Sequence, residues 1–282
     1  MPELPEIETV KLQLEKVLVG QKLVKVIVNS NKTIKGDISA IKNKSVKSIK
    51  RMGKVLVINF GEKLDLGFHF KMTGQLVYES NNQSMPNAKS RIVGGHPTED
   101  YWNKMPSKHT RVIFEFDRGT LYFNDQRMFG WVMLNPKFTS TLGSDALEIT
   151  TPKFLKLLGK LKKPIKLAIM DQELLAGVGN IYANDALWEA GIDPRMPSNK
   201  VTSDKAGLLL EKIKLVLREG IKYGGATASD AKYIDLHGLG GHYQEHFRVY
   251  DRENLPCLRC KTKIEKFVLG GRGTYYCPVC QK

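Results

Sequence analysis

The sequence predicts an α+β protein of several domains, with an N-terminal helix, a β-rich half, a helical half and a short metal-binding tail. Three observations support this prediction. Apolar and polar residues alternate in stretches of the first half, apolar residues recur at helical spacing from Thr151 onward, and all four cysteines lie between Cys257 and Cys280. A chain of 282 residues is long enough for one large domain or two smaller ones.

Composition narrows the class of protein. Hydrophobic residues make up 41% of the chain, which is ample for a buried core. No segment approaches the roughly 20 apolar residues that a membrane-spanning helix needs. The N-terminus also lacks the basic and apolar regions of a signal peptide. We therefore expect a cytoplasmic protein without membrane association.

The chain is strongly basic. Lysine and arginine number 44 against 29 acidic residues, a formal charge of 44 − 29 = +15. This charge favours a polyanionic partner such as nucleic acid, because each phosphate that a cation neutralises releases condensed counterions. The alternative is a basic protein that is merely soluble. Six cations crowd one short stretch, where a strand face could simply present them to solvent: Lys42, Lys44, Lys47, Lys50, Arg51 and Lys54.

The first element is a helix that begins within MPELPEIETV. We expect Pro5 as its first residue, with Glu6 and Glu8 complementing the positive end of the helix dipole. Apolar residues then follow at helical spacing up to Gly20, the expected stop. This pattern gives no reason for a second proline at Pro2.

Strands follow the helix. The stretch LVKVIVN alternates, KVLVINF has the composition of a buried strand, and TRVIFEFDRGTLYFND is a predicted hairpin that turns at Asp117-Arg118-Gly119. Residues 80–107 are polar and interrupted by glycine and proline, so we expect a long exposed loop there. The β-rich half is expected to end near residues 136–151.

Four stretches of the second half carry helical spacing: TPKFLKLLGKL, IKLAIMDQELLA, NIYANDALWEAG and SDKAGLLLEKIKLVLREGIKYGG. Gly177 and Gly179 separate the second helix from the third, and Asn180 stands at the predicted N-cap of the third. The free backbone amides of a helix N-terminus attract phosphate, which Asn180 could also contact. The alternative is a tight helical corner in which Asn180 only caps the helix.

The cysteines form two CxxC pairs, Cys257 with Cys260 and Cys277 with Cys280. This spacing suits one tetrahedral zinc ion closed by a β-hairpin; a redox pair or disulfides are the alternatives. Four cysteines leave no open ligand position, so the zinc would fold the tail and do no hydrolysis. Between the pairs, in GGRGTYY, Arg272 could reach a phosphate or be only a turn residue.

The PELPE start, the helix–GVGN–helix corner and the four-cysteine ribbon together resemble the formamidopyrimidine-DNA glycosylase family of base-excision repair enzymes, which also includes endonuclease VIII. The resemblance covers nearly the whole chain and is interrupted mainly by residues 80–107. It implies a β-sandwich domain at 1–138, a helical domain with a helix–two-turn–helix motif at 150–248 and a zinc finger at 249–282. DNA would lie across the cleft between the domains.

The resemblance assigns the unexplained Pro2 to catalysis. Removal of Met1 would leave a secondary amine, whose attack on a sugar carbon gives a cationic Schiff base that permits β,δ-elimination of the phosphates. Glu3 would relay protons to the sugar ring oxygen and to the amine. Glu6 would help to place Pro2 and a reacting water. Lys54 would hold the phosphate of the lesion near the nucleophile.

Three further positions resemble residues by which the family holds the DNA backbone. His69, before KMTGQL, matches a phosphate-contacting histidine. Asn180 and Arg272 match the two phosphate ligands of the helical corner and the finger. Contacts of this kind position a duplex and carry no sequence information.

Three more positions resemble residues that enter the duplex. Met72 would fill the gap left by an extruded base, Arg127 would reach the orphaned partner base, and Phe129 would wedge beside it. Insertion is needed because the glycosidic bond cannot be reached inside a stacked duplex. Without the shared motif, Met72 and Phe129 would be core residues by default.

The resemblance implies a bifunctional DNA glycosylase and abasic-site lyase. It would act as a monomer with one structural zinc ion, at the nucleoid, on double-stranded DNA containing abasic sites or oxidised purines such as 8-oxoguanine and formamidopyrimidines. Leu4 resembles the oxidised-purine branch, and residues 226–245 are long enough to cover a flipped purine. Met128 stands where many relatives have arginine, which would weaken local phosphate contacts. Two alternatives stay open: an endonuclease VIII-type glycosylase for oxidised pyrimidines, and a non-catalytic protein that binds damaged DNA.

Overall fold

The structure is a computed structural model that describes residues 1–81, 91–95, 104–226 and 241–282. The chain packs as two compact units. The N-terminal unit comprises Met1–Thr139 and Tyr223–His242, and the C-terminal unit comprises Ser140–Lys222 and Tyr243–Lys282. Within the described ranges, no helix combines the length and the apolar character that crossing a bilayer requires.

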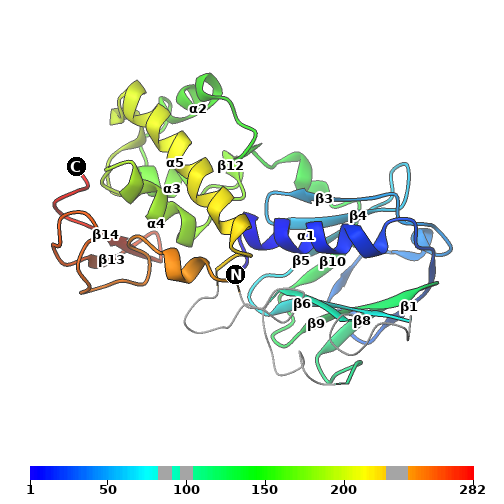
Figure 1. Cartoon of the computed structure of the whole chain (residues 1–282). Coiled ribbons are helices and arrows are strands. Elements are labelled where there is room, and N and C mark those ends of the chain that lie inside the picture. Colours follow the sequence, from blue (N-terminus) through cyan, green and yellow to red (C-terminus); the bar gives the residue numbers. More distant parts are fainter. Residues whose placement is uncertain (82–90, 96–103, 227–240) are drawn as a thin grey trace. The chain divides into compact units, whose positions relative to one another are not determined.

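The N-terminal unit is a β-sandwich (Figure 1). Its described strands form two five-stranded sheets, ordered β1-β8-β9-β6-β7 and β2-β10-β5-β4-β3. The first sheet contains β1 (Leu23–Val28), β6 (Gly74–Ser80), β7 (Arg91–Gly95), β8 (Thr110–Phe116) and β9 (Gly119–Asp125). The second contains β2 (Ile34–Lys35), β3 (Ser48–Met52), β4 (Val55–Asn59), β5 (Asp65–His69) and β10 (Trp131–Leu134). The core lies between the sheets, where the Phe68 ring meets Phe114 edge-on with centroids 5.6 Å apart.

The first helix, α1 (Leu4–Leu18), covers one end of this sandwich. It packs against β3 and β4 of one sheet and β7 of the other, so it lies between two edge strands (Figure 1). The helix begins one residue before the predicted Pro5, because Glu3 takes the N-cap position. It ends before Gly20, whose φ of 84° an L side chain rarely adopts.

The predicted hairpin is β8–β9, and the alternating and buried stretches are β1 and β4. The prediction of one long exposed loop over 80–107 is wrong at its centre, where β7 pairs antiparallel with β6. Two β-branched residues, Ile92 and Val93, supply strand propensity there that the surrounding glycines and prolines conceal. Met105 is also buried, in a cluster on the outer face of the first sheet. The rest of the predicted loop, 82–90 and 96–103, lies outside the described residues.

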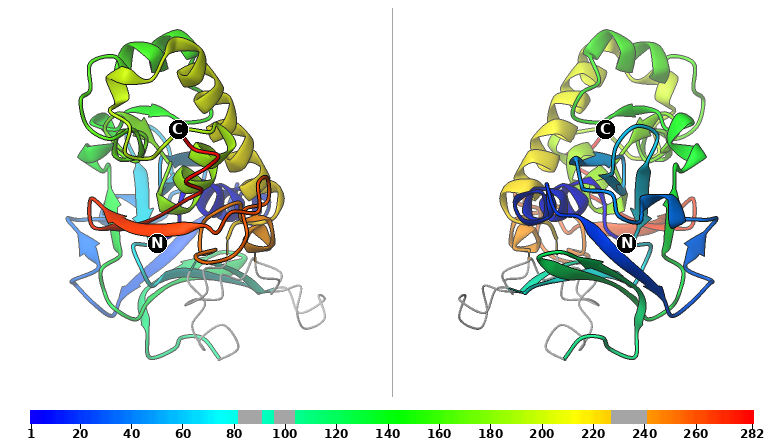
Figure 2. Two further views of the ribbon diagram at one scale, coloured as in Figure 1. Left: turned by 90° about the vertical axis from the view of Figure 1, so that its left-hand side faces the viewer. Right: turned by 90° about the vertical axis from the view of Figure 1, so that its right-hand side faces the viewer.

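The C-terminal unit is helical and ends in a β-hairpin (Figures 1 and 2). Its elements are β11 (Ser144–Asp145), α2 (Thr151–Leu158), α3 (Ile165–Ile169), β12 (Leu175–Ala176), α4 (Asn180–Glu189), α5 (Ser203–Lys222), β13 (Glu265–Leu269) and β14 (Arg272–Tyr276). The long helix α5 packs along α2 and α4, and α4 also contacts α3 and β14. The predicted IKLAIMDQELLA helix stops at Ile169, because the Asp171 carboxylate accepts the Glu173 N–H at 3.0 Å and turns the chain.

Candidate functional site

Two buried carboxylates lie at the start of α1, directly after Pro2. Glu3 is 4% exposed and Glu6 is 2% exposed. They form a capping box: Glu6 Oε2 accepts the Glu3 backbone N–H at 2.6 Å, and the Glu3 side chain accepts the Glu6 backbone N–H. The helix start itself therefore holds both acids beside the second residue of the chain.

A distant segment of the same unit completes this arrangement. Glu6 Oε1 accepts the backbone N–H of Ala226 at 2.9 Å. The neighbouring Gly225 has a φ of 93°, and a Cβ there would lie 2.8 Å from the Glu6 Cγ. Only glycine therefore lets the backbone at 225–226 approach the Glu6 side chain so closely. Ala226 also bridges to His242. The intervening residues 227–240, most of the predicted lesion-covering segment, lie outside the described residues.

Lys54 stands in the turn between β3 and β4 and is 7% exposed. Arg51 ties this turn to α1: its Nε donates to Glu8 Oε2 at 2.7 Å, and its Nη1 donates to the Gly53 carbonyl at 3.2 Å. The six cations that crowd residues 42–54 of the sequence therefore differ in their exposure to solvent. Arg51 and Lys54 are not presented to solvent on a strand face.

His69 lies at the end of β5 and is neutral at pH 7. Burial lowers its pKa to about 3, and the positive charges of Lys71, Lys54 and the chain N-terminus add to this effect. The backbone N–H of Lys71 donates to His69 Nδ1 at 3.0 Å, which leaves the ring proton on Nε2. The His69 ring therefore lies near Lys54 and the chain N-terminus, and it offers one hydrogen-bond donor, the neutral Nε2–H.

Met72 and Phe129 are not core residues. They are 40% and 55% exposed, although both are large and apolar. Met72 lies between β5 and β6, whereas Arg127 and Phe129 lie between β9 and β10. The Arg127 guanidinium lies 4.8 Å from the centre of the Phe129 ring. Between them Met128 has a φ of 55° and is itself 37% exposed.

Asn180 is the first residue of α4, so its predicted place at the N-cap is wrong by one position. Gly179 occupies the N-cap in an extended conformation. The Asn180 amide instead donates to the Gly273 carbonyl at 3.1 Å, directly after Arg272. The helical corner and the hairpin of the tail therefore meet, with Asn180 bonded to the residue that follows Arg272.

Lys166 is a residue of this region that sequence reasoning missed. It is fully buried in α3, and its Nζ donates to the Gly273 carbonyl at 3.0 Å and to the Thr274 hydroxyl at 2.8 Å. A buried lysine requires such partners, because an unpaired buried charge is costly. The one available sign was a lysine within the apolar run IKLAI.

The four cysteine sulfurs lie within 4.8 Å of one another. Those of Cys257 and Cys280 are 3.8 Å apart, and those of Cys260 and Cys277 are 3.4 Å apart. Ligands about 2.3 Å from a tetrahedral zinc ion lie about 3.8 Å from one another, so the four thiolates fit this metal. The Trp188 indole N–H donates to the Cys257 sulfur at 3.4 Å, a hydrogen bond that orients this ligand.

The hairpin β13–β14 joins the two cysteine pairs. Its turn consists of Gly270 and Gly271, with φ of 58° and 73°. Consecutive positive φ values define the tight turn that glycine favours. Arg272 follows at the start of β14 and is exposed, so its side chain is available to a ligand.

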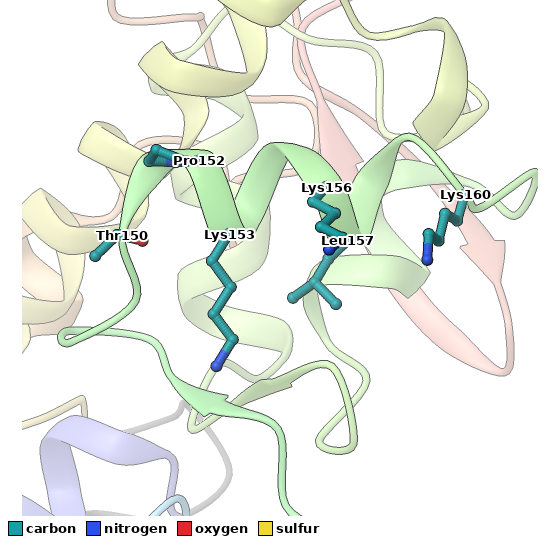
Figure 3. A pocket seen from close by; sticks show the side chains of 6 residues that line it. All are labelled: Thr150, Pro152, Lys153, Lys156, Leu157 and Lys160. Atoms are coloured by element: carbon teal, nitrogen blue, oxygen red, sulfur yellow. The ribbon is translucent and has the colours of Figure 1, made fainter.

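A hollow of about 620 Å³ lies beside α2, and Figure 3 shows the side chains that line it. Its lining includes Lys153, Lys156 and Lys160, with Leu157 among them. Among the described residues, its lining contains no carboxylate, thiol or histidine, so its lysines could attract an anion. It contains none of the predicted site residues.

Three family models match successive parts of the chain. They are the formamidopyrimidine-DNA glycosylase N-terminal domain over residues 1–132, the H2TH domain of the same proteins over 142–232, and a zinc finger found in FPG and IleRS over 254–282. Similar proteins named formamidopyrimidine-DNA glycosylase include that of Pelotomaculum thermopropionicum, 39% identical with 100% of this chain and 99% of the relative covered. That of Solibacter usitatus is 36% identical with both chains fully covered.

Solved structures agree with these matches. The Lactococcus lactis Fpg in complex with abasic-site DNA has a TM-score of 0.82 and 29% identity, covering 99% of each chain. The Thermus thermophilus MutM (Fpg) protein also has a TM-score of 0.82, with 32% identity over 99% of this chain and 98% of that one. A further Lactococcus lactis complex contains DNA with an oxidised pyrimidine, at 30% identity and a TM-score of 0.81, covering 100% of each chain.

Proposed function

The chain belongs to the formamidopyrimidine-DNA glycosylase family, and we propose that Pro2 and the two buried carboxylates after it perform the family's reaction. The enzyme is a DNA glycosylase with the abasic-site lyase activity typical of the family, and its tail cysteines hold a structural zinc ion. One observation supports the residue assignment above all. The capping box of α1 buries Glu3 and Glu6 immediately beside Pro2.

In the proposed reaction, the Pro2 nitrogen, freed by removal of Met1, attacks C1′ of the damaged nucleotide. The glycosidic bond breaks, the base leaves with a proton, and the opened sugar stays bound to the nitrogen as a cationic iminium. The iminium draws electrons from C2′, so the C2′ proton is lost and the 3′-phosphate leaves. A second elimination releases the 5′-phosphate, and hydrolysis of the iminium restores Pro2.

Glu3 is the proposed proton relay of this sequence. It adjoins the nucleophile and can protonate the sugar ring oxygen as the ring opens. Glu6 has a different task, because its two oxygens accept the backbone N–H groups of Glu3 and Ala226. These bonds make Glu6 a fixed support that places the N-terminal residues and a reacting water.

The proposed phosphate ligands differ in charge. Lys54 supplies a full positive charge, and neutral His69 supplies one N–H from Nε2. In the C-terminal unit, Asn180 has a second amide N–H beyond the one that Gly273 accepts, and Arg272 is exposed beside it. Each unit would thus contribute its own phosphate ligands, which position a duplex without reading its sequence.

The partner is DNA, and we propose duplexes that carry oxidised purines or abasic sites as the substrate of a monomer. The chain resembles proteins solved with abasic-site DNA and with Fapy-dG DNA, which supports this substrate. We keep 1–138, 150–248 and 249–282 as the proposed functional domains. The family models cover residues 1–132, 142–232 and 254–282, whereas packing places Tyr223–His242 in the N-terminal unit.

An incision assay tests the proposed substrate. Four duplexes of one sequence would carry 8-oxoguanine, an oxidised pyrimidine, a pre-formed abasic site or no damage. We expect cleavage of the first and third, slower cleavage of the second and none of the fourth. Preference for the oxidised pyrimidine would assign the chain to the endonuclease VIII type, and binding without incision would mark a non-catalytic protein.

Replacement of Arg272 tests the phosphate assignment. We expect Arg272→Ala to weaken binding to damaged and undamaged duplexes alike, with a salt slope about one unit shallower, because a phosphate contact releases about one counterion. Titrations at several salt concentrations measure this slope. Lys263→Ala, which removes an exposed cation elsewhere in the tail, is the control. An unchanged slope would return Arg272 to a structural role.

A further inference from the structure

Thr73 and Asp125 join the two loops that carry Met72, Arg127 and Phe129. Asp125 ends β9 and is fully buried, and Thr73 is 6% exposed. The Thr73 hydroxyl donates to Asp125 Oδ1 and accepts the Arg127 backbone N–H at 3.0 Å. Asp125 Oδ2 accepts the backbone N–H of Gly130 at 2.7 Å.

These hydrogen bonds are continuous and connect the loop before β6 with the 126–130 loop. They run from the Arg127 N–H through the Thr73 hydroxyl to the Asp125 carboxylate, and end at the Gly130 N–H. Both ends of the 126–130 loop are therefore fixed to a single buried pair. A carboxylate only accepts and a hydroxyl donates one proton, so every one of these bonds has a fixed direction.

The backbone is closely packed next to both loops, at Gly74 and Gly130. A Cβ on Gly130 would lie 2.8 Å from Asp125 Oδ2 and 3.0 Å from the His69 carbonyl oxygen. A Cβ on Gly74, beside Thr73, would lie 2.5 Å from the Phe70 carbonyl oxygen. Gly74 is also the register partner of Asp125 in the sheet.

The buried hydrogen bonds of Thr73 and Asp125 hold loops whose own large side chains are exposed. Met72 is 40% exposed and Phe129 is 55% exposed, with the Arg127 guanidinium stacked 4.8 Å from the Phe129 ring centre. Flexible loops would have to be ordered at the moment of insertion, at a cost in conformational entropy. Loops fixed beforehand avoid that cost.

We propose that Thr73 and Asp125 are positioning residues that make Met72, Arg127 and Phe129 enter the duplex as one preorganised unit. The pair acts on extrusion of the damaged base and not on the bond-making steps. This inference rests on the proposed function, since it assumes that these three side chains enter DNA.

The test uses Thr73→Val, which keeps the shape of the side chain but removes the hydroxyl, and Thr73→Ser, which keeps the hydroxyl. A 2-aminopurine opposite the lesion reports insertion by its fluorescence, and single-turnover excision reports the following chemistry. We expect Thr73→Val to slow both by about tenfold or more, which is the effect of losing a buried hydrogen bond to a charged group. Thr73→Ser should restore both.

Trapping with borohydride on a single-stranded abasic oligonucleotide separates positioning from chemistry. That substrate has no base to extrude and no partner base to contact, so Thr73→Val should trap it at the wild-type rate. If the wild-type protein traps neither this oligonucleotide nor a lesion-containing duplex, the proposed function fails. If the wild type traps but the fluorescence change is unaffected by Thr73→Val, only the present inference fails.

Thr110→Val is the matched control. Thr110 is 3% exposed in β8 of the same sheet, and its hydroxyl bonds to Asn124 Oδ1 at 2.8 Å instead of to the 126–130 loop. Equal losses of fluorescence in both valine variants would show a general effect of stability and overturn the proposal. Should Thr73→Val fail to fold, Thr73→Ala serves the same test, because it also removes the hydroxyl that joins Arg127 to Asp125. Wild-type insertion by folded Thr73→Ala would equally overturn the proposal.

Discussion

Removal of the structural zinc is expected to unfold the tail and to abolish specific DNA binding. Zinc-finger peptides gain roughly 10–16 kcal/mol from the metal. The apolar cluster around Cys257 and Cys277 comprises few residues, among them Trp188, Val249 and Ile264. This cluster is too small to fold without the ion. Metal analysis with chelation, followed by limited proteolysis, should locate new cleavage within residues 249–282.

The effect should extend to the helical corner. Lys166 and Asn180 both donate to the Gly273 carbonyl, so loss of the hairpin releases two side chains in addition to Arg272. We therefore expect DNA affinity to fall by about a hundredfold or more, because several phosphate contacts are lost together. Arg272→Ala removes only one of these contacts and should have a smaller effect.

Two variants control for chelation. Cys277→Ser removes a buried ligand and should behave like the chelated protein, with no further response to chelator. Val279→Ser changes a 52% exposed residue of the same CxxC pair and should keep both metal and DNA binding. Full activity in a protein shown to contain no metal would contradict the structural role of zinc.

The sequence predicts local elements better than the bonds that join them. The helix after Pro2, the β8–β9 hairpin and the CxxC pairs each depend on a few consecutive residues, and the structure contains all three. β7 was missed because its strand propensity rests on two residues among glycines. Asn commonly caps helices, which favours Asn180 at the N-cap, whereas its amide bonds to a residue 93 positions away.

The same limit applies to the candidate site. Thr73, Asp125 and Lys166 have no distinctive spacing, and their importance comes from partners that are distant in the sequence. Composition also gave no means of separating Lys54, which is buried, from the solvated lysines of the same stretch. Such residues become visible only when tertiary packing shows which polar groups are buried together.

With Pro2 as nucleophile, borohydride should reduce the iminium to a stable amine and trap a covalent adduct with lesion-containing DNA. Peptide mapping should place the adduct on Pro2 in protein that lacks Met1. In the full chain, Met1 makes the Pro2 nitrogen an amide, so protein that retains Met1 should give no adduct.

Variants at the N-terminus separate the two roles proposed there. Pro2→Gly leaves a primary amine at the N-terminus and should keep partial lyase activity. Pro5→Ala changes a proline whose nitrogen is always an amide, so this variant should form the trapped adduct at the normal rate. Glu3→Gln should lower base excision by about 10²–10⁴-fold, the usual contribution of a general acid–base group. It should lower trapping on a pre-formed abasic site far less, because attack on an open aldehyde needs less acid assistance than breaking a glycosidic bond.

Lys54 is the competing nucleophile, since lysine amines also form Schiff bases. It is buried and, with the chain N-terminus, contributes to lowering the pKa of His69, so both amines lie near one imidazole. Lys54→Arg keeps a charge for the phosphate but cannot form a Schiff base, and it should still trap on Pro2. An adduct mapped to Lys54, or normal trapping by protein that retains Met1, would refute the proposed mechanism.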